Sequence, residues 1–117
     1  MRFYCHGVDN DVLVISADGG LNLANAAEFV RQVEALVDAG LRRIIIDCDK
    51  LTYISSFGIG VLLKLHRRLA KHGGDVKLCN LRGTAAKALA LFRVNTFFAI
   101  YGDLERASLA FRPKTEG

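Results

Sequence analysis

The sequence predicts a single α/β domain with a mostly parallel β-sheet of about four to five strands and about four helices. Along the chain, the apolar residues change from short β-branched runs to helical spacing and back, which is typical of alternating strands and helices. The helical segments are long enough for crossover connections, which place successive strands parallel. With 117 residues, 51% of them apolar and 24% charged, the chain can bury one core without disulfides or metal.

The N-terminal part of the chain predicts a hairpin and then a helix. Residues 2–7 (RFYCHG) and 12–16 (VLVIS) are expected to be strands that pair antiparallel at one edge of the sheet, and the second ends at the turn-forming ADGG. Apolar residues then recur at helical spacing until Gly40, which supplies the stop: Ala26, Phe29, Val30, Val33, Leu36 and Val37. Asn25, with Glu28 three residues later, resembles a capping box for this helix.

The central part predicts a buried strand, a turn and a long helix. Residues 43–47 (RIIID) form a continuous β-branched run, as expected of a strand covered on both faces. A helix is expected from about Phe57 to His72, closed by Gly73 and Gly74. Its apolar stripe consists of Leu62, Leu65 and Leu69.

The C-terminal part repeats the alternation on a smaller scale. Strands are expected at residues 75–80 (DVKLCN) and 96–101 (TFFAIY), with a short helix at 84–92 between them. Asp103 is expected to open the last helix. The domain is therefore expected to run over residues 1–112, followed by a short polar C-terminal tail, 113–117.

Composition excludes several classes of protein. No apolar run approaches the roughly 18 residues that a membrane span needs, and the first residues lack the apolar stretch of a signal peptide, so we expect a cytoplasmic protein without membrane insertion. Cys5, Cys48 and Cys79 are an odd number without CxxC spacing, which argues against a disulfide framework and a zinc site. We expect Cys48 and Cys79, each at the end of a strand-like run, to be apolar fillers.

Enzymatic functions find little support in the sequence. It contains no G-x-S-x-G elbow, no Walker A motif and no glycine-rich dinucleotide fingerprint. His6, His66 and His72 do not pair with carboxylates at metal-binding spacing. Asp47 lies at a strand end, where some α/β enzymes carry a catalytic group, but it has no visible companion. We therefore expect a non-enzymatic protein with no cofactor and no metal site.

The turn Ser55-Ser56-Phe57-Gly58 allows two interpretations. A serine before a helix is most often an N-cap, because its oxygen accepts a hydrogen bond from a free N–H of the first turn. A phosphate also suits this position, since the first-turn N–H groups are unpaired and the helix dipole is positive there. Gly58 and Gly60 lower helix stability and suggest that something approaches the backbone closely.

The long helix also carries a basic face of Lys64, Arg67, Arg68 and Lys71. This face lacks interleaved aromatic residues and a helix-turn-helix pattern, so we do not expect nucleic-acid binding. A solvated face is the simplest interpretation, and an acidic protein partner is the alternative. The formal net charge of +4 permits such a partner without requiring one.

Four stretches of the chain resemble the STAS domain family. They are GGLN (19–22), IIIDCDKLTYISSFGIGVLL (44–63), RRLAKHGGDVKLCN (67–80) and RVNTFFAIY (93–101), and the resemblance covers about residues 12–110. The central stretch is similar to the Asp-Ser-Ser/Thr-Gly-Leu-Gly motif of many members. With no further domain in the sequence, a stand-alone anti-sigma factor antagonist is a closer match than a sulphate-transporter tail.

The resemblance implies a site and partners. In such antagonists the serine after the motif aspartate is phosphorylated by a serine kinase of the histidine-kinase-like ATPase type, which is also the anti-sigma factor, and a PP2C-type phosphatase removes the phosphate. Aligned on Gly58, this serine is Ser56, and Ser55 is a minor alternative. Ser55 replaces the aspartate, Phe57 takes the following Ser/Thr position, and Asn22 lies near a frequently acidic position. Both Ser55 and Asn22 therefore remove negative charge from the site.

The resemblance therefore predicts a phosphorylation-switched regulator. In its unphosphorylated form it is expected to bind the anti-sigma kinase and release the sigma factor, through a partner-binding surface of Asn22, Ser55, Ser56, Phe57 and Gly58. Phe57 is a plausible contact anchor on this surface. The alternative is a STAS scaffold without phosphorylation, or an accessory subunit of a sensory complex or a lipid transporter. If neither Ser56→Asp nor Ser56→Ala changes partner binding, that alternative is favoured.

Overall fold

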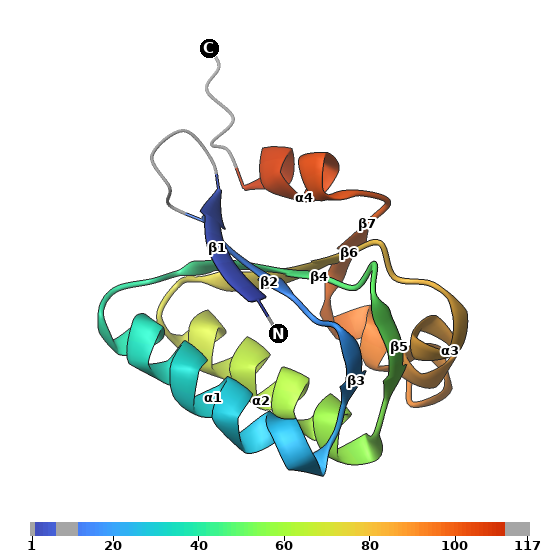
Figure 1. Cartoon of the computed structure of the whole chain (residues 1–117). Helices are drawn as coiled ribbons and strands as arrows, with labels where there is room; N and C mark the ends of the chain where they lie inside the picture. Colours follow the sequence, from blue (N-terminus) through green and yellow to red (C-terminus); the bar gives the residue numbers. More distant parts are fainter. Residues whose placement is uncertain (1, 7–11, 112–117) are drawn as a thin grey trace.

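Five strands form the main sheet of a computed structural model, which describes residues 2–6 and 12–111 (Figure 1). The strands are β1 (Arg2–His6), β2 (Val12–Ser16), β4 (Arg43–Asp47), β6 (Asp75–Cys79) and β7 (Ala99–Tyr101), and they lie in that order across the sheet. β1 pairs antiparallel with β2, and all other neighbours are parallel. The predicted α/β class, the edge hairpin and the mostly parallel sheet are confirmed.

Helices cover both faces of this sheet unequally. The helices α1 (Leu23–Asp38), α2 (Ser56–Lys71) and α3 (Gly83–Leu91) lie on one face, and the short α4 (Leu104–Ala110) lies on the other (Figure 1). The larger core lies under the first three helices and includes Ile44, Ile46, Val33 and Leu69. Ile45, between the two isoleucines, points to the smaller core under α4. The β-branched run of β4 is thus buried on both faces, as its sequence predicts.

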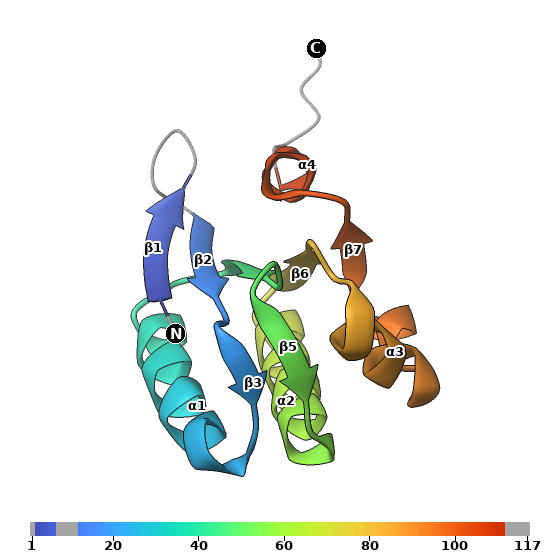
Figure 2. The same ribbon diagram turned by 45° about the vertical axis from the view of Figure 1, so that its right-hand side comes forward.

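A second, two-stranded sheet was not predicted. Residues Gly19–Leu21 form β3 and residues Leu51–Ile54 form β5, and the two pair in parallel beside the N-terminal ends of α1 and α2 (Figure 2). Both segments were expected to be loops, and the long helix was expected to follow the turn after β4 directly. Leu21, Leu51 and Ile54 are buried in the main core, and this burial orders both segments.

Two local expectations were wrong. The N-cap of α1 is Asn22, not Asn25, because the Asn22 side chain accepts a hydrogen bond from the Ala24 N–H while the Asn25 side chain accepts one from the Asn22 N–H. The strand expected over residues 96–101 is shortened to Ala99–Tyr101. A 3₁₀ helix, Val94–Phe97, precedes it, and Val94 is buried in the core.

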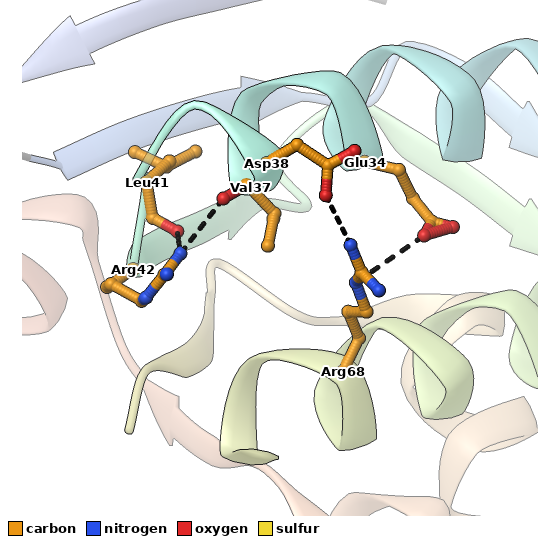
Figure 3. A network of polar contacts seen from close by, with 6 residues as sticks. All are labelled: Glu34, Val37, Asp38, Leu41, Arg42 and Arg68. Carbon is orange, nitrogen blue, oxygen red and sulfur yellow. Dashed lines mark hydrogen bonds and ion pairs between the residues drawn. The ribbon is translucent and has the colours of Figure 1, made fainter. Parts of the chain in front are cut away.

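The C-terminal halves of α1 and α2 are joined by an ion-pair network (Figure 3). The Arg68 guanidinium lies between Asp38 and Glu34 of α1, with nitrogen–oxygen distances of 2.5 and 3.5 Å. Just beyond α1, the Arg42 guanidinium donates to the carbonyl oxygens of Val37 and Leu41 at 2.9 and 2.8 Å. The Arg68 ion pairs link the two helices at the end remote from Ser56, and the Arg42 hydrogen bonds fix the turn after α1.

The cysteine prediction is confirmed where the structure describes the side chains. Cys48 and Cys79 are buried and unpaired, and burial raises the pKa of each thiol to about 12. Both thiols are therefore protonated at neutral pH and act as packing groups. The side chain of Cys5 and the tail 113–117 lie outside the described part, and the domain limits of 1–112 stay a prediction.

None of the described helices has the length and apolar character needed to cross a membrane.

Candidate functional site

The loops that open α1 and α2 lie side by side because β3 and β5 are paired. The Ser55 N–H donates to the Leu21 carbonyl oxygen at 3.0 Å, and the Ser55 hydroxyl donates to the same oxygen at 3.3 Å. β3 and β5 lie side by side (Figure 2) and Leu21 pairs with Ile54, so Asn22, directly after β3, lies near Ser55 and Ser56, directly after β5. The structure therefore brings the five predicted site residues together at the start of α1 and α2, with Ser56 and Phe57 exposed, Asn22 and Ser55 half-buried and Gly58 buried.

The two adjacent serines have different roles. Ser55 is the N-cap of α2, and its oxygen accepts a hydrogen bond from the Gly58 N–H at 3.1 Å. Ser55 is half-buried, and both its donor and its acceptor are used within the fold. Ser56 is the first residue of α2 and is exposed. Over the described ranges, no residue hydrogen-bonds the Ser56 hydroxyl.

Asn22 connects the two loops through a residue that sequence reasoning missed. Its side-chain oxygen accepts from the Ala24 N–H at 2.8 Å, and its amide nitrogen donates to the Tyr53 hydroxyl at 2.5 Å. The Tyr53 ring also occupies the space where a side chain at position 20 would lie, which explains Gly20. No local pattern singles out Tyr53, because its role depends on the pairing of two strands that lie far apart in the sequence.

Gly58 and Gly60 differ in what surrounds them. A Cβ atom at Gly58 would lie 2.6 Å from the Leu21 carbonyl oxygen and 2.9 Å from Cγ1 of Ile54. The close approach expected at this glycine is therefore made by the protein's own backbone. At Gly60, a Cβ atom would find no other group within 4 Å. The fold itself thus explains Gly58 and leaves Gly60 unexplained.

An apolar groove of about 580 Å³ begins beside Ser56 and runs between α1 and α2. Its lining consists of Ala26, Ala27, Val30, Ser56, Phe57, Gly60, Val61 and Lys64. Phe57 lines this groove and is 48% exposed, and its role as a contact anchor stays a prediction. Sequence reasoning missed the α1 side of the groove, although the helical spacing of Ala26, Ala27 and Val30 was visible.

The first turn of α2 has no negative charge of its own, because it contains no acidic residue. Its free N–H groups and the helix dipole favour an anion.

Asp47, the carboxylate weighed as a catalytic group, lies elsewhere and accepts hydrogen bonds from Asn80 and from the Asp49 N–H. Within the described residues, no group of three or more His, Cys, Asp or Glu side chains could hold a metal ion.

Comparison with known proteins points to one family. The model of the STAS domain family matches residues 7–107. A Bordetella bronchiseptica protein named "Putative anti-sigma factor antagonist BtrV" is 31% identical over 101 residues, which cover 86% of this chain and 87% of the relative. Both matches extend over nearly the whole chain.

Solved structures share the fold. The crystal structure of a "putative anti-sigma factor antagonist" from Thermotoga maritima has a TM-score of 0.86 at 24% identity and covers 95% of both chains. The anti-sigma factor antagonist SpoIIAA in its unphosphorylated form has a TM-score of 0.69 at 21% identity, with 93% of this chain and 96% of that one covered. The phosphorylated form of SpoIIAA, from Bacillus, has a TM-score of 0.73 at 21% identity, with 95% and 100% covered.

Proposed function

The chain belongs to the STAS domain family, and we propose that it is an anti-sigma factor antagonist switched by phosphate on Ser56. In its unphosphorylated form it binds an anti-sigma factor that is a serine kinase of the histidine-kinase-like ATPase type, and the sigma factor is released. A PP2C-type phosphatase restores the unphosphorylated form. Because all these partners act where ATP and sigma factors are found, the proposal places the protein in the cytoplasm.

The observation that carries this proposal is the difference between Ser55 and Ser56. Transfer of phosphate to a serine needs a hydroxyl that a kinase can reach and that the fold does not use. Ser56 is exposed and its hydroxyl makes no hydrogen bond with another described residue, whereas the Ser55 hydroxyl caps α2 and bonds Leu21. Ser56 is therefore the phosphoacceptor, and Ser55 supports it structurally.

A phosphate on Ser56 is compatible with the fold but not with a partner packed on the same surface. At the first position of α2 the added charge of roughly −1.5 to −2 faces free N–H groups and the positive end of the helix dipole. A partner that covers Ser56 and Phe57 would have to bury this charge, which costs several kcal/mol if it is unpaired. Because about 1.4 kcal/mol changes an affinity tenfold, one phosphate can release the partner.

Phosphopeptide mass spectrometry tests the acceptor directly. The purified chain is incubated with ATP and an extract of its own host, and the protein is also isolated from the host across growth and stress conditions. Trypsin cleaves after Lys50 and Lys64, so one peptide contains both serines, and fragment ions between them assign the phosphate. We expect phosphate on Ser56 in the wild type and in Ser55→Ala, and none on this peptide in Ser56→Ala.

A phosphate that persists on this peptide in Ser56→Ala would contradict the assignment of Ser56. If Ser56 carries no phosphate in any extract or condition, the protein is better described as a STAS scaffold without this switch. Binding to the host's serine kinase provides a second test. Ser56→Asp should weaken it by about tenfold or more, and the uncharged Ser56→Asn should weaken it much less. Equal binding by the two folded variants would refute the charge-based switch.

A further inference from the structure

The exposed side of α2 carries a straight stripe with two chemically different halves. Phe57, Gly60, Lys64, Arg67 and Lys71 follow one another at alternating spacings of three and four residues, which places them on one face of the helix. The first half is apolar and opens into the groove between α1 and α2. The second half is cationic. A partner that binds along this stripe therefore meets an apolar pocket and then a row of positive charges.

Gly60 indicates that this stripe is shaped for a partner. Glycine lowers the stability of a helix interior relative to alanine, so its presence in α2 calls for a reason. Gly58 has such a reason in the Leu21 carbonyl oxygen, but no group of the protein lies within 4 Å of where a Cβ at Gly60 would be. The missing side chain leaves the floor of the groove open, and the space can receive a side chain from outside.

The three cations of the stripe, Lys64, Arg67 and Lys71, take no part in the ion pairs among the described residues. Arg68, by contrast, turns toward α1 and pairs with Glu34 and Asp38 (Figure 3). The polar network thus uses Arg68, and Lys64, Arg67 and Lys71 lie outside it.

We propose that the groove receives an apolar side chain from an acidic amphipathic helix of the partner, whose carboxylates lie along Lys64, Arg67 and Lys71. The alternating spacing suits a helix, because side chains three and four residues apart form the ridges that pack between neighbouring helices. The inference rests on the proposed function in that this partner is the protein that acts at Ser56. It specifies the chemistry of the surface that the partner presents.

This geometry also gives the phosphate on Ser56 a second effect. Ser56 lines the groove, so its phosphate would lie beside the docked apolar side chain, and the nearest carboxylate, the one at Lys64, would lie about 12 Å further along α2. Like charges repel, and over this distance the repulsion adds modestly to the desolvation of the phosphate. The acidic character of the partner helix would thus increase the sensitivity of its binding to the phosphorylation state of Ser56.

A designed peptide tests the surface without the natural partner. An alanine-based helical peptide carries one leucine and, on the same face, glutamates at three- and four-residue spacing on both sides. A matched peptide carries lysines instead of glutamates. Both are titrated into the isotope-labelled full chain, and backbone amide resonances are followed by NMR. We expect the acidic peptide to shift the amides of the groove and stripe, and the basic peptide to leave them unchanged.

Variants of the chain locate the contact. Gly60→Leu fills the groove, and the triple variant with Lys64→Glu, Arg67→Glu and Lys71→Glu reverses the charge of the stripe. Each of the two variants should lower the affinity for the acidic peptide about tenfold or more. Circular dichroism verifies that these variants are folded. The matched control is Lys87→Glu, an exposed charge change on α3, which does not line the groove and should leave binding unchanged.

The inference is overturned if the acidic peptide causes no shifts, if both peptides bind alike, if Gly60→Leu binds undiminished, or if the shifts lie elsewhere. It is also overturned if only vesicles containing phosphatidylglycerol bind the stripe, since the surface would then face a membrane. Phosphorylation of Ser56 is measured separately. If Ser56 is phosphorylated but the acidic peptide shifts no amide resonances, this inference is refuted while the proposed function is supported.

Discussion

Alanine substitutions at Gly58 and Gly60 should change stability in opposite directions. Both glycines lie in the first half of α2, and in an unconstrained helix each substitution would stabilise by roughly 1 kcal/mol. Only Gly58 has the chain's own backbone against it, with the Leu21 carbonyl oxygen 2.6 Å from the position of the new methyl group. The same chemical change, two residues apart in one helix, therefore isolates the effect of that contact.

The size of the expected difference in stability depends on whether the Leu21 carbonyl group can move away from the new methyl group. The Leu21 carbonyl oxygen accepts two hydrogen bonds from Ser55, so it cannot shift without disturbing the junction of β3 and β5. Overpacking of this kind costs typically about 1 to 3 kcal/mol. Gly60→Ala meets open space and keeps the gain of up to about 1 kcal/mol. Because the gain in helix propensity is common to both substitutions, we expect the two variants to differ by the overpacking cost, about 1 to 3 kcal/mol in the free energy of unfolding.

Urea unfolding followed by circular dichroism measures this difference. With a slope of about 2 kcal/mol/M for a domain of this size, the two midpoints should lie about 0.5 to 1.5 M apart, with Gly60→Ala above the wild type and Gly58→Ala below it. Equal slopes would show that both variants unfold in the same way. Gly58→Ala at or above the wild-type midpoint, or Gly60→Ala well below it, would refute the assignment of the close approach to Gly58.

Three further substitutions test the contacts around the site. Ser55→Ala removes the N-cap of α2 and should cost about 1 kcal/mol in urea unfolding while Ser56 remains phosphorylated; unchanged stability would contradict the capping role. Arg68→Ala removes a side chain that is 36% exposed and paired with α1, so we expect the free energy of unfolding to fall by only about 0.5 kcal/mol. This difference should shrink in high salt, and Arg67→Ala, whose side chain lies outside the ion pairs of the described residues, is the control. Cys48 and Cys79 keep their protons in the folded protein up to a pKa of about 12, whereas the unfolded chain loses them near 9. The contribution of these thiols to the free energy of unfolding should therefore be fully present below pH 9 and should fall as the pH rises toward 12. Cys48→Ala should make the decrease of the unfolding free energy with pH less steep, which unfolding measured across this range would show.

Local sequence patterns were sufficient for most of the fold. The β-branched run of β4 predicts burial on both faces, because polar residues are absent from either side of the strand. The leucine spacing of α2 and the glycines after it locate this helix to within about one residue of its observed ends, since both signals lie within the helix or next to it. The resemblance of the central stretch to the STAS motif singles out Ser56, and the family match confirms that resemblance.

Contacts between distant segments decided the rest. The capping signal at Asn25 and Glu28 was locally plausible, yet β3 ends at Leu21 and the chain turns into the helix at Asn22. The pairing of β3 with β5 joins residues about thirty positions apart, and no periodicity within either short segment announces it. Glycine-rich strands of three or four residues carry too little pattern of their own and are ordered by the core on which they lie.

The candidate site also combines features that the local sequence predicts with features that depend on tertiary contacts. The sequence by itself determined that two serines, an aromatic residue and two glycines open a helix after a buried strand. Only the tertiary structure decided which serine the fold uses, because the partner of Ser55 is the carbonyl of Leu21 on another strand. It likewise explained Gly58 by that carbonyl and left Gly60 open to the surface, since the space beside a helix depends on which elements pack against it.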